Sequence, residues 1–222
     1  MNKSLLTNTV IQGDCLEYMK TLPDNSIDLV LTDPPYGIGI KNKVWWWTKK
    51  APSKTFVDVD EWDKFIPTKE YFEEIKRISS NAIIFWWNYF IEYLENSPCW
   101  LIWDKRWNII PPRTFADCEI ARTNFNKPTR KFEFIWDGFI QWDMKNKEIR
   151  KHPTQKPVPL FRWILENYSE PWMTILDPFA WSWTTWIACK ELWRKYILIE
   201  KEPKYVEIIN KRLSNTTVSL FH

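Results

Sequence analysis

The sequence predicts an α/β protein with a mostly parallel, twisted sheet covered by helices on both faces. Three observations predict this class: short apolar runs alternate with stretches of helical periodicity, several runs end at an acidic residue, and no internal repeat interrupts the alternation. With 222 residues and 45% hydrophobic content, the chain can build one sizeable core. We therefore expect a single domain over residues 1–222, with a small lobe or loops near 38–66 and 105–150.

The expected elements follow one another in a regular order. Strands are expected at the apolar runs 9–11, 27–32, 82–85, 100–103, 132–136, 175–176 and 196–199. Helices are expected where apolar residues recur every three or four positions, at 15–22, after Pro67, at 160–168, at 184–192 and at 206–213. The polar stretch 38–66 is a long loop, and loops of this length are usually functional.

Composition excludes several classes of protein. No apolar run reaches membrane-spanning length, and Met1 to Val10 is too short and polar for a signal peptide, so we expect a cytoplasmic protein without a membrane partner. The four cysteines form no C-x-x-C pair, and the chain has two histidines, so we expect no metal. A phosphate-binding ATPase is disfavoured because G-x-x-x-x-G-K-[ST] is absent.

One apolar run ends in a rigid polar loop of unusual chemistry. The run Leu29 to Thr32 leads into Asp33-Pro34-Pro35-Tyr36. Proline has no amide proton, so the two prolines leave the sheet as a stiff loop that fixes the direction of its carbonyls. A carboxylate and a fixed carbonyl can together accept both hydrogens of one small amino group, and an aromatic ring can face a flat base. This arrangement suits the exocyclic amine of a nucleobase; the alternative is a plain loop acid beside an edge aromatic.

A second run lies far downstream, at Met173 to Ala180, and is followed by Trp181-Ser182-Trp183-Thr184-Thr185 and a helical stretch. Together the two runs resemble those of the S-adenosylmethionine-dependent amino-group DNA methyltransferases, whose loops read D-P-F-x-G-S-G-T-T and D-P-P-Y. Further matches are Gly13-Asp14, the segment 152–157 and the segment 197–200. The resemblance extends from about Thr9 to Leu213 and is loose over 105–150.

The resemblance implies a fold, a cofactor and a reaction. The fold is the Rossmann-like methyltransferase sheet in permuted order, with the catalytic strand before the cofactor strand, as in the subgroup called β. The implied activity is site-specific transfer of a methyl group from S-adenosyl-L-methionine to N6 of a flipped adenine in double-stranded DNA, within a restriction-modification system. The alternatives are methylation of cytosine N4 or of RNA. Asp33, where other members carry Ser, favours adenine by resemblance.

The resemblance also implies site residues. The catalytic residues are Asp33, Pro34, Pro35 and Tyr36. The cofactor-binding residues are Asp14, Asp33, Thr154, Gln155, Lys156, Asp177, Phe179, Ala180, Trp181, Ser182, Trp183, Thr184 and Glu200. Acids that follow parallel strands meet at one edge of the sheet, so we expect four of them, Asp14, Asp33, Asp177 and Glu200, to lie together. Two alternatives stay open: Glu200 as a cap of the helix at Pro203, and Lys156 as a solvated lysine.

Two basic stretches are candidates for contact with DNA phosphates. Residues 41–57 and 105–131 each carry a net charge of +5, more than the +3 of the whole chain. The candidate residues are Lys41, Lys43, Lys49, Lys50, Lys127, Arg130 and Lys131. The alternative is a pair of solvated loops. We expect the small lobe or loops near 38–66 and 105–150 to recognise the DNA target. The sequence carries no signal for the recognised DNA site, the oligomeric state or a restriction partner.

One departure from the family pattern is severe, because Trp181 and Trp183 stand where the family has glycine. Glycine there lets the backbone turn tightly and approach the cofactor. The chain has 4 Gly and 17 Trp, and ten tryptophans occupy turn-like or glycine-like positions. These are Trp45, Trp46, Trp47, Trp86, Trp87, Trp172, Trp181, Trp183, Trp186 and Trp193. Counting them as glycine gives 14 Gly, close to the usual share of about 7%.

This composition suggests a hypothesis about the gene. The sequence would have been translated with UGA read as tryptophan, from a genome that reads UGA as glycine. The alternative is that the tryptophans are real and form an aromatic surface. In that case the cofactor site is blocked, and the chain is a DNA-binding module without catalytic activity.

Overall fold

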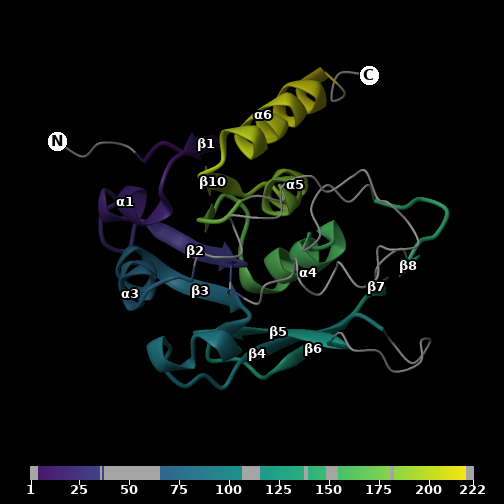
Figure 1. Cartoon of the computed structure of the whole chain (residues 1–222), viewed down its shortest axis with the longest axis horizontal. Helices are drawn as coiled ribbons and strands as arrows, with labels where there is room; N and C mark the ends of the chain where they lie inside the picture. Colours follow the sequence, from purple (N-terminus) through teal and green to yellow (C-terminus); the bar gives the residue numbers. More distant parts are fainter. Residues whose placement is uncertain are drawn as a thin grey trace. The chain divides into compact units, whose positions relative to one another are not determined.

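The structure is a computed structural model, and it describes residues 5–35, 37, 66–106, 116–137, 140–148, 155–180 and 183–218 (Figure 1). The chain divides into two compact units. Unit 1 comprises Met1–Thr32, Glu73–Ile83 and Lys156–His222, and unit 2 comprises Asp33–Phe72 and Ile84–Gln155. The prediction of one domain over the whole chain stays a prediction.

Unit 1 contains the parallel sheet that the sequence predicts. Its strands are β1 (Thr9–Gln12), β2 (Ile27–Thr32), β9 (Thr174–Asp177) and β10 (Lys195–Glu200). They lie in the order β1-β10-β9-β2, and every pairing is parallel. All residues of β9 and all but the first of β10 are buried, as expected for parallel strands covered on both faces. The next strand, β3 (Ser79–Phe85), adjoins β2 and continues into unit 2.

The helices of unit 1 follow the predicted periodicity. They are α1 (Cys15–Lys20), α4 (Val158–Tyr168), α5 (Thr184–Glu191) and α6 (Pro203–Val218). The helix α3 (Lys69–Ile78) begins in unit 2 and ends in unit 1. The predicted apolar stripe of α4 is confirmed, because Leu160, Ile164, Leu165 and Tyr168 are buried. In unit 1, α4 contacts α5, and α6 contacts β1 and β10 (Figure 1).

Unit 2 contains the end of β3 and the strands β4 (Trp100–Asp104), β5 (Cys118–Thr123) and β6 (Arg130–Glu133). The order is β3-β5-β4-β6, with β5 antiparallel and β6 parallel to β4. Two short 3-10 turns, η3 (Trp87–Tyr89) and η4 (Ile91–Tyr93), follow β3, and β7 (Trp136–Asp137) pairs with β8 (Ile140–Gln141). The predicted strand 132–136 is therefore two strands with a break after Glu133.

The sequence analysis missed β5 because two of its residues are charged and buried. Glu119 is paired with Lys105, whose ammonium lies 2.9 Å from its carboxylate. The guanidinium of Arg122 donates a hydrogen bond of 2.6 Å to the Glu95 carbonyl, and burial lowers its pKa. Charges are buried in strands only when they are paired in this way, which a pattern of apolar residues does not reveal.

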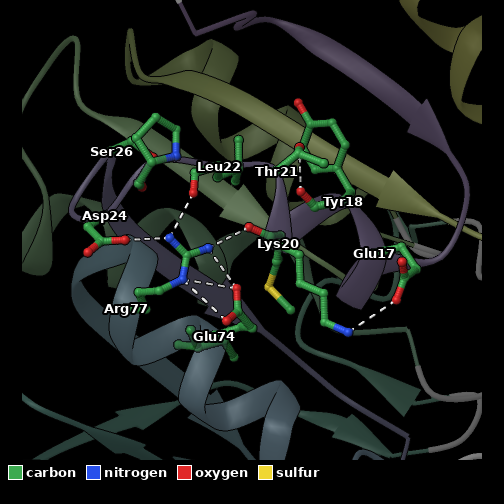
Figure 2. Close-up of polar contacts among 12 residues, drawn as sticks. Glu17, Tyr18, Lys20, Thr21, Leu22, Asp24, Ser26, Glu74 and Arg77 are labelled. Carbon is green, nitrogen blue, oxygen red and sulfur yellow. Dashed lines mark hydrogen bonds and ion pairs between the residues drawn. The ribbon is translucent and has the colours of Figure 1, made fainter.

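A single arginine fastens α3 to the turn between α1 and β2 (Figure 2). In Arg77, Nη1 donates to the Leu22 carbonyl at 2.8 Å and to the Asp24 carboxylate at 2.5 Å. Nη2 donates to the Met19 carbonyl at 3.0 Å and to the Glu74 carboxylate at 2.7 Å. The side chain thus joins two carbonyls and two carboxylates around the turn that follows α1.

We expect Arg77→Ala to lower the free energy of unfolding by about 2–4 kcal/mol, because it removes the hydrogen bonds of the guanidinium to two carbonyls and its ion pair with the half-buried Glu74 carboxylate. Urea denaturation measures the change. Arg162→Ala is the matched control, since Arg162 also pairs with a carboxylate, on Glu191, but both side chains are largely exposed. The control is expected to cost less than about 1 kcal/mol. Equal losses in the two variants would contradict the role assigned to Arg77.

Candidate cofactor site at the carboxyl edge of unit 1

Three of the predicted acids lie at the carboxyl ends of adjacent strands. Gln12 pairs with Glu200 and Leu198 pairs with Asp177, which fixes the register of β1, β10 and β9. The Gly13 amide donates to the Glu200 carbonyl at 3.0 Å, and Asp14 follows directly. The predicted meeting of acids at one edge is therefore confirmed for Asp14, Asp177 and Glu200. Asp33 belongs to unit 2, and its part in this edge stays a prediction.

Asp177 anchors the loop that leads from β9 to α5. One carboxylate oxygen accepts a hydrogen bond of 3.1 Å from the Phe179 amide, and the other accepts one of 2.5 Å from the Thr185 hydroxyl. The Ala180 amide donates to the Ile199 carbonyl at 3.0 Å, which holds the loop against β10. Asp177 therefore positions this loop and the first turn of α5.

Glu200 is a buried acid whose carboxyl group is also bound to the backbone. One of its oxygens accepts a hydrogen bond of 2.7 Å from the Glu202 amide. Glu202 precedes α6, whereas a cap accepts from an amide of the first helical turn, so this bond does not show the capping alternative. Glu200 is 7% exposed, and this burial raises its pKa to about 7 despite the hydrogen bond. The ribose contact implied by the resemblance stays a prediction.

We expect the burial of Glu200 to make the protein less stable as the pH rises. Its pKa is about 7 in the folded state against 4.5 for the free group, so both states hold the proton below pH 4.5. Between these values the unfolded chain loses the proton first, so stability falls, by roughly 3 kcal/mol at most above pH 7. The measurement is urea denaturation between pH 5 and 8. Glu200→Gln should remove this slope, while Glu166→Gln, a change at an exposed acid, keeps it. An unchanged slope in Glu200→Gln would refute the assignment.

Asp14 serves as the N-cap of α1. Its Oδ1 accepts hydrogen bonds from the Leu16 amide at 3.0 Å and the Glu17 amide at 3.4 Å. Its other oxygen lies 3.8 Å from the Lys201 ammonium. Capping thus accounts for one oxygen, while the second lies at the edge of the sheet near the end of β10.

Gln155 and Lys156 are both buried, and they belong to unit 2 and unit 1 respectively. In unit 2 the Trp136 indole N–H donates to the Gln155 carbonyl at 2.9 Å. In unit 1 the Thr184 hydroxyl donates to the Lys156 carbonyl at 2.9 Å and ties the start of α4 to the start of α5. Lys156 is 2% exposed, so the alternative of a solvated lysine is wrong. A lysine is buried to this extent only where its ammonium is compensated.

Trp183 occupies the turn that opens α5. Its backbone is left-handed, with a φ of 46°, and its amide donates to the Ala180 carbonyl at 3.3 Å. The indole is 2% exposed and is therefore buried. The backbone at this position is thus one that glycine adopts readily. The neighbouring Trp181 and Ser182 lie outside the described residues.

In unit 2, the residues Asp33, Pro34 and Pro35 are buried where they follow β2. Lys127 lies over the Phe125 ring at 5.4 Å, and Lys131 is paired with Glu133 and lies 3.8 Å from the Asp104 carboxylate. Arg130 is exposed and begins β6. The other candidates of these groups lie outside the described residues. They are Tyr36, Lys41, Lys43, Lys49, Lys50 and Thr154.

Two absences hold for the described part of the chain. Within the described ranges, no group of three His, Cys, Asp or Glu side chains could hold a metal ion. No helix found in those ranges is long and apolar enough to cross a membrane.

The sequence analysis missed Thr185, which binds the second oxygen of Asp177. A signal for it existed, since Thr185 is the second threonine of the D-P-F run. The analysis took only the first, Thr184. The structure shows that both hydroxyls fix the start of α5, one on Lys156 and one on Asp177.

Comparison with known proteins defines the class. The family model described as DNA methylase, for N6 and N4 amino groups, matches residues 103–211. The Type II methyltransferase M.HinfI of Haemophilus influenzae is 32% identical, over 93% of this chain and 68% of that protein. The Type II methyltransferase M2.MboI of Moraxella bovis is 27% identical, over 94% of this chain and 88% of that protein.

The fold agrees with that comparison. A crystal structure of an M1.HpyAVI–SAM complex matches with a TM-score of 0.56 and 23% identity, over 92% of this chain and 98% of that one. The mixed, mostly parallel α/β architecture is thus the Rossmann-like methyltransferase fold. The chain belongs to the N6/N4 amino-group DNA methylase family.

Proposed function

We propose that this chain transfers a methyl group from S-adenosyl-L-methionine to N6 of adenine at specific sites in double-stranded DNA, as the modification enzyme of a restriction-modification system. The observation that carries the proposal is the edge at which Asp177 anchors the loop before α5 beside the buried Glu200. This is the end of a parallel sheet where ligands bind. The order of the runs, with D-P-P before D-P-F, supports the permuted β subgroup.

The residues at this edge fit the cofactor with one exception. Glu200 has a buried carboxyl suited to ribose hydroxyls, and Asp14 has one oxygen outside its cap interactions. Gln155, Lys156, Phe179, Ala180 and Thr184 lie in the two segments tied together at α5, and Thr154 precedes them. When bound, the cofactor supplies a methyl group activated by a positive sulfur. Trp183 does not fit, because an indole stands where the backbone needs to approach a ligand.

The roles proposed for the D-P-P-Y residues follow from the weakness of the nucleophile. The lone pair of adenine N6 is delocalised into the ring, so N6 attacks poorly while that conjugation persists. The Asp33 carboxylate and the Pro34 carbonyl each accept one N6 hydrogen, which favours a tetrahedral nitrogen and stabilises the charge that develops on it. Pro35 keeps the loop stiff, and Tyr36 stacks on the base. The target base leaves the duplex first, since N6 lies inside it.

Methylation-aware sequencing of DNA from cells that express the chain, with glycine at the ten candidate positions, tests this proposal. The expected result is N6-methyladenine at one recurring sequence, absent from cells that carry an empty vector. N4-methylcytosine would support the cytosine alternative, and modified RNA the RNA alternative; either would refute the adenine proposal. No modified base in either nucleic acid would also refute the proposal.

Neutralising three bases of unit 2 is expected to weaken DNA binding and flatten its salt dependence. Changing Lys127, Arg130 and Lys131 together to glutamine should lower the slope of log K against log salt by up to about three units, since each phosphate contact contributes nearly one. We expect less than the full change because Lys131 is already paired with Glu133. Fluorescence anisotropy at several salt concentrations measures it.

The matched control for this triple variant removes the same charge from exposed lysines of unit 1, at Lys20, Lys76 and Lys195. Its slope is expected to stay near that of the parent chain. Equal slopes for the two triple variants would assign the unit 2 bases to a solvated surface.

A further inference from the structure

We propose that Trp86, Trp172, Trp183 and Trp193 are glycine in the protein that the cell makes, encoded by UGA codons read as glycine. Among the described residues, six amino acids other than glycine have a positive φ. Two are Asn8 and Asn25, and asparagine tolerates this region. The other four are these tryptophans, with φ of 54°, 71°, 46° and 60° in that order.

Trp193 ends α5 at a position that glycine normally fills. The Arg194 amide donates to the Cys189 carbonyl at 2.8 Å, and the Trp193 amide donates to the Lys190 carbonyl at 3.4 Å. With Leu192 as the C-cap, these two bonds define a Schellman motif. Its residue after the cap is left-handed and is usually glycine, because any Cβ crowds the backbone there. The backbone therefore specifies glycine at 193.

Trp172 occupies the third position of a tight turn between α4 and β9. Pro171 stands at the second position, and the Met173 amide donates to the Glu170 carbonyl at 3.3 Å. With a φ of 71° at Trp172, these are the features of a type II turn. Its second position favours proline and its third requires a positive φ, which selects glycine. The segment Glu170-Pro171-Trp172-Met173 is therefore a turn that selects glycine at its third position, and tryptophan stands there.

Trp86 and Trp183 precede η3 and α5, each with a left-handed backbone and no side-chain cap. Trp86 donates its amide to the Ile120 carbonyl at 3.0 Å, and Trp183 donates to the Ala180 carbonyl at 3.3 Å. These bonds hold both residues where the chain reverses from a strand into a helix. A residue before a helix normally has an extended backbone, and a left-handed one there favours glycine.

Other tryptophans of the chain behave as real indoles. Trp100, Trp103 and Trp136 donate their indole N–H groups to backbone carbonyls at 2.9, 3.0 and 2.9 Å, and none has a positive φ. Two of the four candidates also differ from these tryptophans in the exposure of their side chains. Trp172 and Trp193 are 66% and 69% exposed, with ring centroids 6.2 Å apart, whereas large aromatics are normally buried.

The inference stands apart from the proposed function, because Trp86, Trp172 and Trp193 are not among its site residues. It also removes the misfit of that site. Glycine at 183 takes the indole out of the turn that opens α5 and lets a ligand approach the backbone amides.

Paired variants at 172 and 193 test the backbone argument. Trp172→Gly with Trp193→Gly is expected to melt about 2–4 °C higher per position than Trp172→Ala with Trp193→Ala, because alanine keeps the steric cost of the positive φ. Trp142 is a matched control, since it is 48% exposed and has no positive φ. There Trp142→Gly should melt no higher than Trp142→Ala. Equal melting temperatures for the two double variants would overturn the inference.

The codons of the gene test the inference most directly. Sequencing it from the source genome is expected to show TGA at codons 86, 172, 183 and 193, and TGG at codons 100, 103 and 136. Peptide mass spectrometry of the protein from its own cells should then find glycine at the four positions. TGG at the four codons, TGA at both sets of codons, or tryptophan in the four peptides would overturn the inference.

Discussion

In the chain that carries glycine at the ten candidate positions, Asp33→Ala is expected to lower the rate of methyl transfer by about 10² to 10³ or more while leaving cofactor binding nearly intact. The reason is that the Asp33 carboxylate serves the target amine, and removal of one aligned electrostatic partner in an active site costs this much. The rate is measured with an isotopically labelled methyl group and a duplex that contains the recognised sequence. Cofactor affinity is measured by calorimetry on the same preparation.

The matched control for Asp33→Ala is Asp143→Ala, which removes an exposed acid of unit 2. Its rate should equal that of the parent chain. Asp33→Asn keeps the size of the buried side chain and separates a loss of charge from a loss of folding. More than a few percent of the parent rate in Asp33→Ala would show that the proposed mechanism is wrong.

Restoring glycine in the cofactor loop has the second large expected effect. The chain with tryptophan at 181 and 183 should bind S-adenosyl-L-methionine poorly or not at all. The double variant Trp181→Gly with Trp183→Gly should recover binding. A positive φ at tryptophan costs on the order of 1–3 kcal/mol of stability with or without ligand. The loss of affinity is expected from the indole side chains, since glycine at these two positions lets the backbone approach the cofactor. Calorimetry on both proteins under the same conditions measures the difference.

The control for the loop variant is Trp172→Gly with Trp193→Gly, which makes the same change twice outside the site. It should gain stability without recovering cofactor binding. If the chain with tryptophan at 181 and 183 bound S-adenosyl-L-methionine as tightly as the variant with glycine at both positions, the loop tryptophans would have to be accepted as real features of the site.

The parallel sheet could be predicted because its strands are short apolar runs that end at Asp177 and Glu200 or lead into Asp33. Such strands are buried on both faces, so they appear in the sequence as continuous apolar runs. The strand β5 could not be predicted in this way, since its Glu119 and Arg122 are buried by pairing with residues distant in sequence. The division into two units also has no local signal, because it depends on which elements contact each other.

The sequence indicates which residues belong to the candidate site better than it indicates what each residue does there. The motifs indicated Asp177 and Glu200, but the bonds to Thr185 and to the Glu202 amide depend on the folded loop. The burial of Lys156 depends on the start of α4 lying against α5, which the sequence does not encode locally. The unusual tryptophans were visible in composition, but their positive φ values required the structure.

The central claim is that this chain methylates adenine N6 with Asp33 as the residue that receives the amine. In the most direct test, the chain that carries glycine at the ten candidate positions is incubated with labelled S-adenosyl-L-methionine and duplex DNA. The DNA is then digested to nucleosides, and the labelled product is identified by mass spectrometry. The account predicts label in N6-methyladenine with the parent chain and none with Asp33→Ala. Label in N4-methylcytosine, or equal labelling by the two proteins, would contradict it.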